Sequence, residues 1–232
     1  VISNMRILPP EFGSKIGSKE PENRLKLFTE IGSKEIMPAH FPIFHSHLDL
    51  AHHYWEKLLQ KGDWAIDATC GNGNDTLKLA KILLEKQGGV IGIDIQQEAI
   101  ALTNQLLESH FPLEDRAHVH LYCHSHTHFP PLAIEKPIRL VVYNLGYLPK
   151  GDKQKTTMTQ TTLESVQKAL DLIVPSGVVS ITCYPGHAEG LKEELALFNE
   201  IANLPATTWN VCYHTFPNRM SAPSLLLIQK SH

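Results

Sequence analysis

The segment that most constrains the fold of this chain is residues 67–76, with the sequence DATCGNGNDT. It follows a short apolar run at residues 64–67, and apolar residues with helical spacing come after it. Gly71 and Gly73 allow the backbone to turn tightly at this point and to approach a ligand closely. A second apolar run at residues 90–94 follows the helix and also ends on an acid. The segment therefore predicts a strand, a glycine loop, a helix and a second strand.

The same alternation of strands and helices continues to the end of the chain. We expect strands at residues 64–67, 90–94, 119–123, 138–145, 178–183, 209–215 and 224–229, and helices at residues 48–59, 76–86, 98–110, 161–173 and 191–201. Such alternation predicts a parallel sheet with helices on both faces. The last two strands are too close in sequence for a helical crossover, so they must pair antiparallel. We therefore expect an α/β, Rossmann-like fold with a mostly parallel sheet and a C-terminal antiparallel hairpin.

Residues 1–44 do not share this pattern. They contain five prolines and little apolar periodicity, so we expect a partly flexible N-terminal extension before one domain at residues 45–232. The formal net charge of −3 excludes a uniformly basic surface that would coat nucleic acid. Four widely spaced cysteines argue against a disulfide scaffold. Because no apolar run approaches the ~20 residues that cross a bilayer, we expect no membrane partner.

The acids around the glycine loop discriminate between two classes of ligand. A dinucleotide places its pyrophosphate on the helix N-terminus, where Asp67 and Asp75 would repel it, and Thr76 stands where a third glycine is usual. S-adenosylmethionine carries an ammonium and a sulfonium but no phosphate, so the same acids attract it. Asp94 ends the next strand, where a carboxylate can bind the hydroxyls of a ribose. This pattern favours S-adenosylmethionine over NAD; a turn without any ligand is the simpler alternative.

A second motif, YNLGYLPKGDK at residues 143–153, follows the fourth strand. Ligands of open α/β sheets bind at such strand ends. Asn144 and Tyr147 have the N-x-x-Y spacing of amino-group methyltransferases, in which the Asn carbonyl accepts a hydrogen bond from the target amine and the aromatic ring stacks on the base. Leu145 and Gly146 replace the usual Pro-Pro. An ordinary loop containing glycine and proline is the alternative.

Histidines alternate along the third strand and its exit, at positions 118, 120, 124, 126 and 128. Strand geometry arranges such imidazoles in a row rather than around one point, so we expect no metal site. Ser125 and His126 follow the strand and are predicted to line the adenine or methionine end of the cofactor pocket. His187 follows the fifth strand, on the side where an acceptor would bind.

These motifs together resemble a known family. The matching segments, in chain order, are residues 67–76, Asp94-Ile95-Gln96, Ser125-His126, residues 144–153 and Gly186-His187-x-Glu189-Gly190. They are similar to the S-adenosylmethionine-dependent tRNA 5-(aminomethyl)uridine N-methyltransferases, a family formerly described as rRNA methylases. The resemblance covers residues 47–230, and NLGYLPxGDK is its most specific motif. Lys150 stands where the family has a glycine.

The resemblance implies a class I methyltransferase fold and methylation of the amine of 5-aminomethyl-(2-thio)uridine at the tRNA wobble position. With the loop analysis, it gives cofactor-binding candidates Asp67, Gly71, Asn72, Gly73, Asn74, Asp75, Thr76, Asp94, Ile95, Gln96, Ser125, His126, Asn144 and Gly146. The catalytic candidates are Asn144, Tyr147 and Asp152, with Asp152, Tyr147 or water as proton acceptor. The substrate-binding candidates are Lys150, Lys153, His187, Asn218 and Arg219, the basic ones as contacts to phosphates of the tRNA anticodon region.

The alternatives at this point are a methyltransferase for another amine or RNA base, including rRNA, an NAD-dependent oxidoreductase and a non-catalytic RNA-binding module. We expect a cytoplasmic protein, or a chloroplast or mitochondrial one if residues 1–44 remain from a targeted precursor. The sequence leaves the oligomeric state open, and a homodimer is compatible with it.

Overall fold

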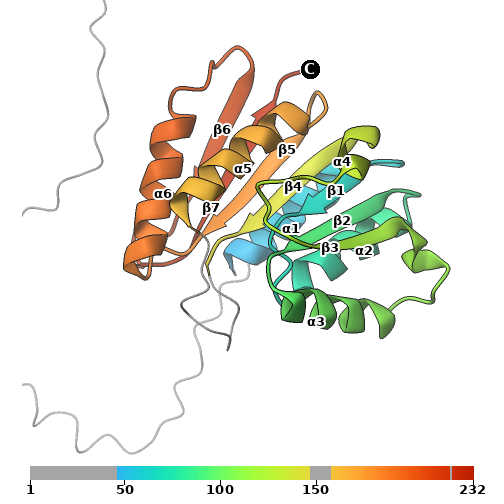
Figure 1. Cartoon of the computed structure of the whole chain (residues 1–232). Helices are drawn as coiled ribbons and strands as arrows, with labels where there is room; N and C mark the ends of the chain where they lie inside the picture. Colours follow the sequence, from blue (N-terminus) through green and yellow to red (C-terminus); the bar gives the residue numbers. More distant parts are fainter. Residues whose placement is uncertain (1–45, 147–157, 220) are drawn as a thin grey trace, which may run out of the picture. The chain divides into compact units, whose positions relative to one another are not determined.

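The computed structural model describes residues 46–146, 158–219 and 221–232 (Figure 1). Its strands are β1 (Trp64–Asp67), β2 (Gly89–Asp94), β3 (Val119–Cys123), β4 (Ile138–Asn144), β5 (Val178–Cys183), β6 (Trp209–His214) and β7 (Ser224–Lys230). Its helices are α1 (His47–Leu58), α2 (Asn74–Leu84), α3 (Gln97–Glu108), α4 (Pro131–Glu135), α5 (Thr159–Leu172) and α6 (Ala188–Ile201), with a 3-10 turn at Asp115–His118. The predicted strands and long helices are all present, whereas the short α4 and the 3-10 turn were not predicted.

The strands form one seven-stranded sheet in the order β3-β2-β1-β4-β5-β7-β6. Strands β1 to β5 are parallel, and β7 pairs antiparallel with both β5 and β6. The predicted α/β fold with a C-terminal antiparallel hairpin is therefore confirmed. The insertion of β7 between β5 and β6 was not predicted. The chain reverses its direction of winding between β1 and β4, which is the point where open sheets of this kind bind ligands.

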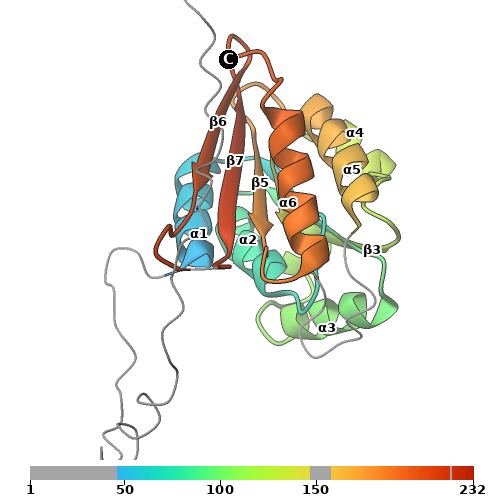
Figure 2. The same ribbon diagram turned by 90° about the vertical axis from the view of Figure 1, so that its left-hand side faces the viewer.

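Alternation along the strands gives the sheet two apolar faces. Ala65 of β1 and Leu140 of β4 pack with α1, α2 and α3, while Ile66 and Val141 pack on the opposite face with α4, α5 and α6. Figure 2 shows α1 and α2 on one side of the sheet and α5 and α6 on the other. Because successive side chains of a strand point to opposite faces, central strands covered by helices on both sides are mostly apolar.

Helix α1 is fixed to the sheet by a buried hydrogen bond. The indole Nε1–H of Trp55, which is 2% exposed, donates to Oγ of Ser180 in β5 over 3.1 Å. Ser46 caps the helix by accepting a hydrogen bond from the N–H of Asp49. These contacts place the first turns of α1 beside the carboxyl ends of the central strands.

Three helices begin at least two residues earlier than apolar periodicity predicts. Helix α2 begins at Asn74 rather than residue 76, α5 at Thr159 rather than residue 161, and α6 at Ala188 rather than residue 191. In α6, Nδ1 of His187 accepts a hydrogen bond from the N–H of Gly190 over 3.1 Å, which caps the helix. Polar first turns do not contribute to an apolar repeat, so the sequence pattern misses them.

Candidate active site

The glycine loop between β1 and α2 is shaped by two positive φ angles. Gly71 has φ +53° and Gly73 has φ +81°, a region that glycine adopts without the cost of a side chain. A Cβ at Gly73 would lie 2.8 Å from Cα of Thr103 in α3. Gly73 is therefore required both for the turn and for the close approach of the loop to α3.

The carboxylate of Asp94 ties this loop to the end of β2. Its Oδ2 accepts a hydrogen bond from the N–H of Gly71 and its Oδ1 one from the N–H of Gln96, each over 2.9 Å. Each oxygen keeps acceptor capacity for a ligand, because a carboxylate can accept about four hydrogen bonds in all. Ile95, the next residue, is 70% exposed beside it. The end of β2 thus presents a polar acceptor next to an exposed apolar side chain.

Asp67 supports the loop from inside the protein. Its side chain is fully buried and accepts hydrogen bonds from Oγ1 of Thr76 over 2.6 Å and from the N–H of Thr69 over 3.2 Å. Burial, with the nearby charge of Asp75, raises the pKa of the Asp67 carboxyl to about 7. The position of Asp67 indicates that it shapes the loop rather than lying open to a ligand.

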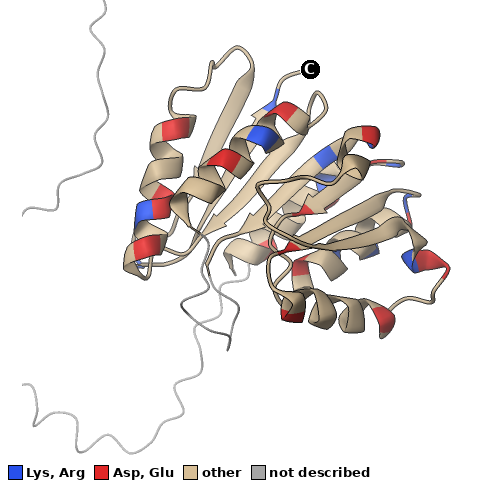
Figure 3. Cartoon of the chain, viewed as in Figure 1, with Lys and Arg blue, Asp and Glu red and all other residues tan. Residues whose placement is uncertain are grey.

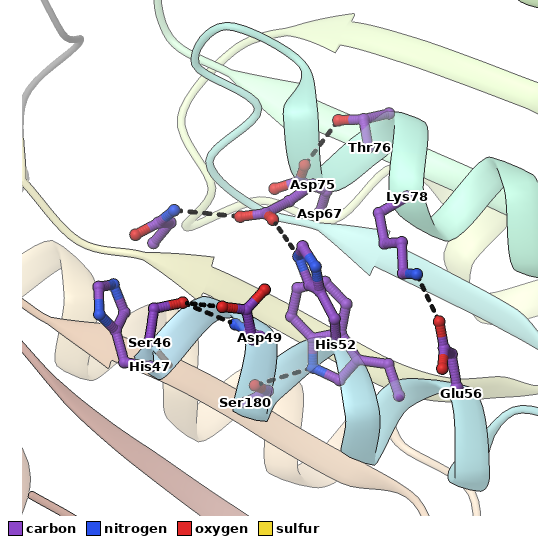
Figure 4. A network of polar contacts seen from close by, with 12 residues as sticks. Ser46, His47, Asp49, His52, Glu56, Asp67, Asp75, Thr76, Lys78 and Ser180 are labelled. Carbon is purple, nitrogen blue, oxygen red and sulfur yellow. Dashed lines mark hydrogen bonds and ion pairs between the residues drawn. The ribbon is translucent and has the colours of Figure 1, made fainter. Parts of the chain in front are cut away.

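Asp75, in the first turn of α2, joins three elements (Figure 4). Its Oδ1 lies 2.8 Å from Nε2 of His52 in α1, and its Oδ2 accepts a hydrogen bond from Nδ2 of Asn144 over 3.0 Å. The side chain of Asp75 is 10% exposed and that of His52 is 25% exposed. The structure therefore brings the predicted residues Asp75 and Asn144 together, at the start of α2 and the end of β4.

Asn144 is held at two points and leaves one atom unused. Its backbone N–H donates to Oγ1 of Thr69 over 2.7 Å, which fixes the main chain at the end of β4. Its side-chain Oδ1 is buried and has no hydrogen-bond partner among the described residues. An unpaired buried acceptor is unfavourable by ~1–3 kcal/mol, so this atom is ready to accept a hydrogen bond from a ligand.

Tyr184, directly after β5, lies on the same side of the site. Its hydroxyl is 3.2 Å from Nε2 of His47, and the two rings meet edge to face. Burial and the charge of Asp75 raise the pKa of Tyr184 to about 12, although the nearby Asn144 side chain acts in the opposite direction. Gly146, two residues after Asn144, has φ +137°, and a Cβ there would lie 3.9 Å from the Tyr184 ring.

Sequence reasoning missed His47, His52 and Tyr184. Tyr184 could have been found, because the strand-end argument used for Asn144 applies equally to the residue after β5. The two histidines belong to a helix whose amphipathic pattern carries no indication that its first turns reach the glycine loop. Their place in the site follows from the packing of α1 against the sheet.

Other predicted site residues do not take part in the hydrogen bonds of Asp75. The Ser125 hydroxyl bonds Thr127 over 3.0 Å, and burial lowers the pKa of His126, which packs against Tyr143, to about 4. His187 caps α6. Asn218 and Arg219 are exposed between β6 and β7. Asn72 is half-buried in the glycine loop, and Asn74 is exposed at the start of α2.

Several predictions fall on residues that the structure does not describe. Tyr147, Lys150, Asp152 and Lys153 lie outside the described ranges. Within those ranges, no group of three or more His, Cys, Asp or Glu side chains could hold a metal ion. None of the helices described is both long enough and apolar enough to span a bilayer. Acids and bases are interspersed along α5 and α6 (Figure 3).

Comparisons with known proteins agree with the motifs. Residues 90–230 match the family described as "Putative rRNA methylase", and residues 59–120 match a methyltransferase domain. An Arabidopsis thaliana relative, described as a chloroplastic tRNA (mnm(5)s(2)U34)-methyltransferase, is 37% identical over 188 residues, covering 78% of this chain and 68% of the relative.

Solved structures of similar proteins also belong to methyltransferases by their descriptions. A "putative rRNA-methylase" from Clostridium thermocellum is 33% identical, with a TM-score of 0.74, over 80% of this chain and 97% of that one. A "putative methyltransferase" from Streptococcus mutans, in complex with SAH, is 31% identical, with a TM-score of 0.68, over 79% of this chain and 97% of that one.

Proposed function

Since this chain belongs to the family described as "Putative rRNA methylase", we propose that it methylates the amine of 5-aminomethyl-(2-thio)uridine at the tRNA wobble position. It is an S-adenosylmethionine-dependent methyltransferase. The description of the Arabidopsis relative supports the wobble uridine as substrate. The buried, unpaired Oδ1 of Asn144 is the observation that supports an amine as the reacting group.

The residues at the ends of β1 and β2 fit S-adenosylmethionine. Asp94 offers acceptor capacity to ribose hydroxyls, and the exposed Ile95 offers an apolar surface to an adenine ring. Asp75 adds a carboxylate, favourable to a ligand that carries an ammonium and a sulfonium. When bound, S-adenosylmethionine supplies a methyl carbon that a nucleophile can attack.

Asn144 is placed to receive the acceptor. An alkylamine resembles lysine, whose pKa is ~10.4, so it is mostly protonated near neutral pH and then has no lone pair for attack. A position beside another cation lowers the pKa of the amine. Oδ1 of Asn144 can accept a hydrogen bond from one N–H of the neutral amine and so direct its lone pair. Much of the rate enhancement would then come from proximity and alignment.

The finer parts of the proposal rest on the sequence. We propose the tRNA anticodon region as the partner, with Arg219 as one phosphate contact. Lys150 and Lys153 as further phosphate contacts, and Asp152 as proton acceptor, stay predictions. A cytoplasmic or organellar location also stays a prediction; the Arabidopsis relative is described as chloroplastic.

A methyl-transfer assay tests the proposed function. The full chain is incubated with labelled S-adenosylmethionine and either tRNA carrying 5-aminomethyluridine or the same tRNA with unmodified uridine. We expect label only in the first tRNA, and nucleoside mass spectrometry should locate it on the side-chain amine. Equal labelling of both tRNAs would contradict the amine assignment. If rRNA were labelled in the same assay and tRNA were not, the result would support the substrate named in the family description.

A further inference from the structure

We infer that His52 and Asp75 are positioning residues that set the orientation of the Asn144 side-chain amide, an inference that rests on the proposed function of Asn144. The three side chains come from α1, from the first turn of α2 and from the end of β4. They form one continuous line of hydrogen bonds, from Nε2 of His52 through the carboxylate of Asp75 to Nδ2 of Asn144.

The chemistry of the carboxylate decides which way the amide faces. An ionised carboxylate only accepts hydrogen bonds, so both neighbours of Asp75 must present donors to it. His52 therefore donates from Nε2 over 2.8 Å, and Asn144 turns its NH2 group toward Oδ2 over 3.0 Å. Oδ1 of Asn144 must then face away from Asp75, where it is buried without a partner among the described residues.

This orientation matters because the two ends of an amide are chemically opposite. With Oδ1 toward the acceptor, Asn144 can accept a hydrogen bond from an amine. If the amide were reversed, two N–H donors would face that amine, and the lone pair needed for attack would be drawn toward them. The backbone of Asn144 is held separately by Thr69, so Asp75 acts on the side chain alone.

His52 restricts the carboxylate in the same way that Asp75 restricts Asn144. The His52 ring lies against Trp55, with ring centroids 4.7 Å apart, and Trp55 is fixed to Ser180 of β5. Helix α1 thus delivers a rigid donor to Oδ1 of Asp75. Because its Oδ2 holds the side chain of Asn144, we assign Asp75 to the acceptor side of the site in addition to its predicted place beside the cofactor.

The test uses variants of the full chain with matched controls. His52→Ala removes the donor to Asp75, His52→Gln restores an N–H donor, and Asp75→Asn removes the requirement that Asn144 present its NH2 group. His53→Ala changes the exposed neighbour of His52, and Glu56→Gln removes the ionic part of a second polar contact between α1 and α2, with Lys78. The measurements are kcat and KM for aminated tRNA, the Kd for S-adenosylmethionine, and Tm.

We expect kcat to fall about 10-fold in His52→Ala and about 10²-fold in Asp75→Asn, the scale for misplacing a reacting group. His52→Gln should recover most of the loss, while Kd and Tm in the His52 variants and kcat in both controls stay near wild type. If His52→Ala is no slower than His53→Ala, or if His52→Gln does not recover activity, the inference is wrong. A joint loss of turnover, cofactor affinity and Tm in His52→Ala would likewise overturn it in favour of a purely structural role.

A second readout does not depend on activity. In ¹⁵N-labelled protein, the Asn144 side-chain amide signals can be identified by their absence in Asn144→Ala. They should shift in His52→Ala and Asp75→Asn but not in His53→Ala. If these shifts occur but wild-type protein does not methylate aminated tRNA, the positioning contacts stand and the proposed function fails. Unchanged signals in both variants would refute the positioning role whatever the substrate.

Discussion

The backbone N–H of Gly71 donates to Oδ2 of Asp94 over 2.9 Å, so the glycine loop after β1 is tied to the carboxyl end of β2. The same carboxylate holds the N–H of Gln96. One side chain therefore sets the distance between the two parts of the chain that we expect to hold the amino acid and ribose portions of the cofactor.

Asp94→Ala should weaken S-adenosylmethionine binding by on the order of 1–3 kcal/mol, the scale for losing a charged hydrogen-bond partner. Asp94→Asn, which keeps one acceptor, should lose less. Calorimetric titration measures both affinities, with Glu98→Ala, at the exposed start of α3, as the control. Unchanged affinity in Asp94→Ala would remove Asp94 from the ribose role.

Asn144→Ala should separate cofactor binding from turnover. Its Oδ1 is proposed to face the acceptor amine, so S-adenosylmethionine affinity should stay near wild type while turnover falls ~10²-fold or more. Single-turnover assays on protein with a normal melting curve measure this. Tyr147→Ala, predicted to remove a stacking contact of ~1–3 kcal/mol, should mainly weaken tRNA binding. Wild-type rates in both variants would place the acceptor site elsewhere.

Gly73→Ala should destabilise the fold more than Gly62→Ala. The two glycines have nearly the same φ, +81° and +82°, so the cost of a side chain in that conformation, ~1–2 kcal/mol, is common to both. A Cβ at Gly62 meets nothing within 4 Å, whereas one at Gly73 clashes with Thr103. We expect a further ~1–3 kcal/mol for Gly73→Ala, from overpacking, in urea unfolding. Equal losses of stability in the two variants would show that α3 can shift to accommodate the added Cβ without an energetic cost.

The stability contribution of Asp67 should depend on pH. Its pKa is raised from 3.8 to about 7 in the folded protein, so between these values the folded state binds more protons than the unfolded state. The contribution of this group to the free energy of unfolding is therefore largest below pH 4, and it is lost as the pH rises toward 7. Relative to wild type, Asp67→Asn should therefore gain stability over this range, by roughly 1.4 kcal/mol per unit of pKa shift.

Urea unfolding at several pH values measures that difference. Comparison with the variant is necessary because His126 changes the stability of the protein in the opposite direction. Its pKa is lowered from 6.5 to about 4 in the folded protein, so its contribution to stability is lost as the pH falls below 6.5. Asp171→Asn, at an exposed position in α5, is the control and should show no such trend. A pH-independent difference for Asp67→Asn would mean that Asp67 stays ionised when buried.

Local features of the sequence were sufficient for most of the fold. The strand before Asp67, the glycine loop and the acid at Asp94 were predicted because turn chemistry and apolar periodicity depend on neighbouring residues. The antiparallel pairing of the last two strands followed from the shortness of their connection. Helix starts were less accurate, since caps such as His187 do not add to an apolar repeat.

The sequence by itself thus determined the strands and the long helices, the likeness to methyltransferases and the residues at the ends of β1, β2 and β4. Only the tertiary structure decided that β7 lies between β5 and β6, and that α1 brings His52 to Asp75 and His47 to Tyr184. His47 and Tyr184 are 137 positions apart in the chain. Such contacts depend on how apolar faces pack across the whole sheet, and no pattern of neighbouring residues records that packing.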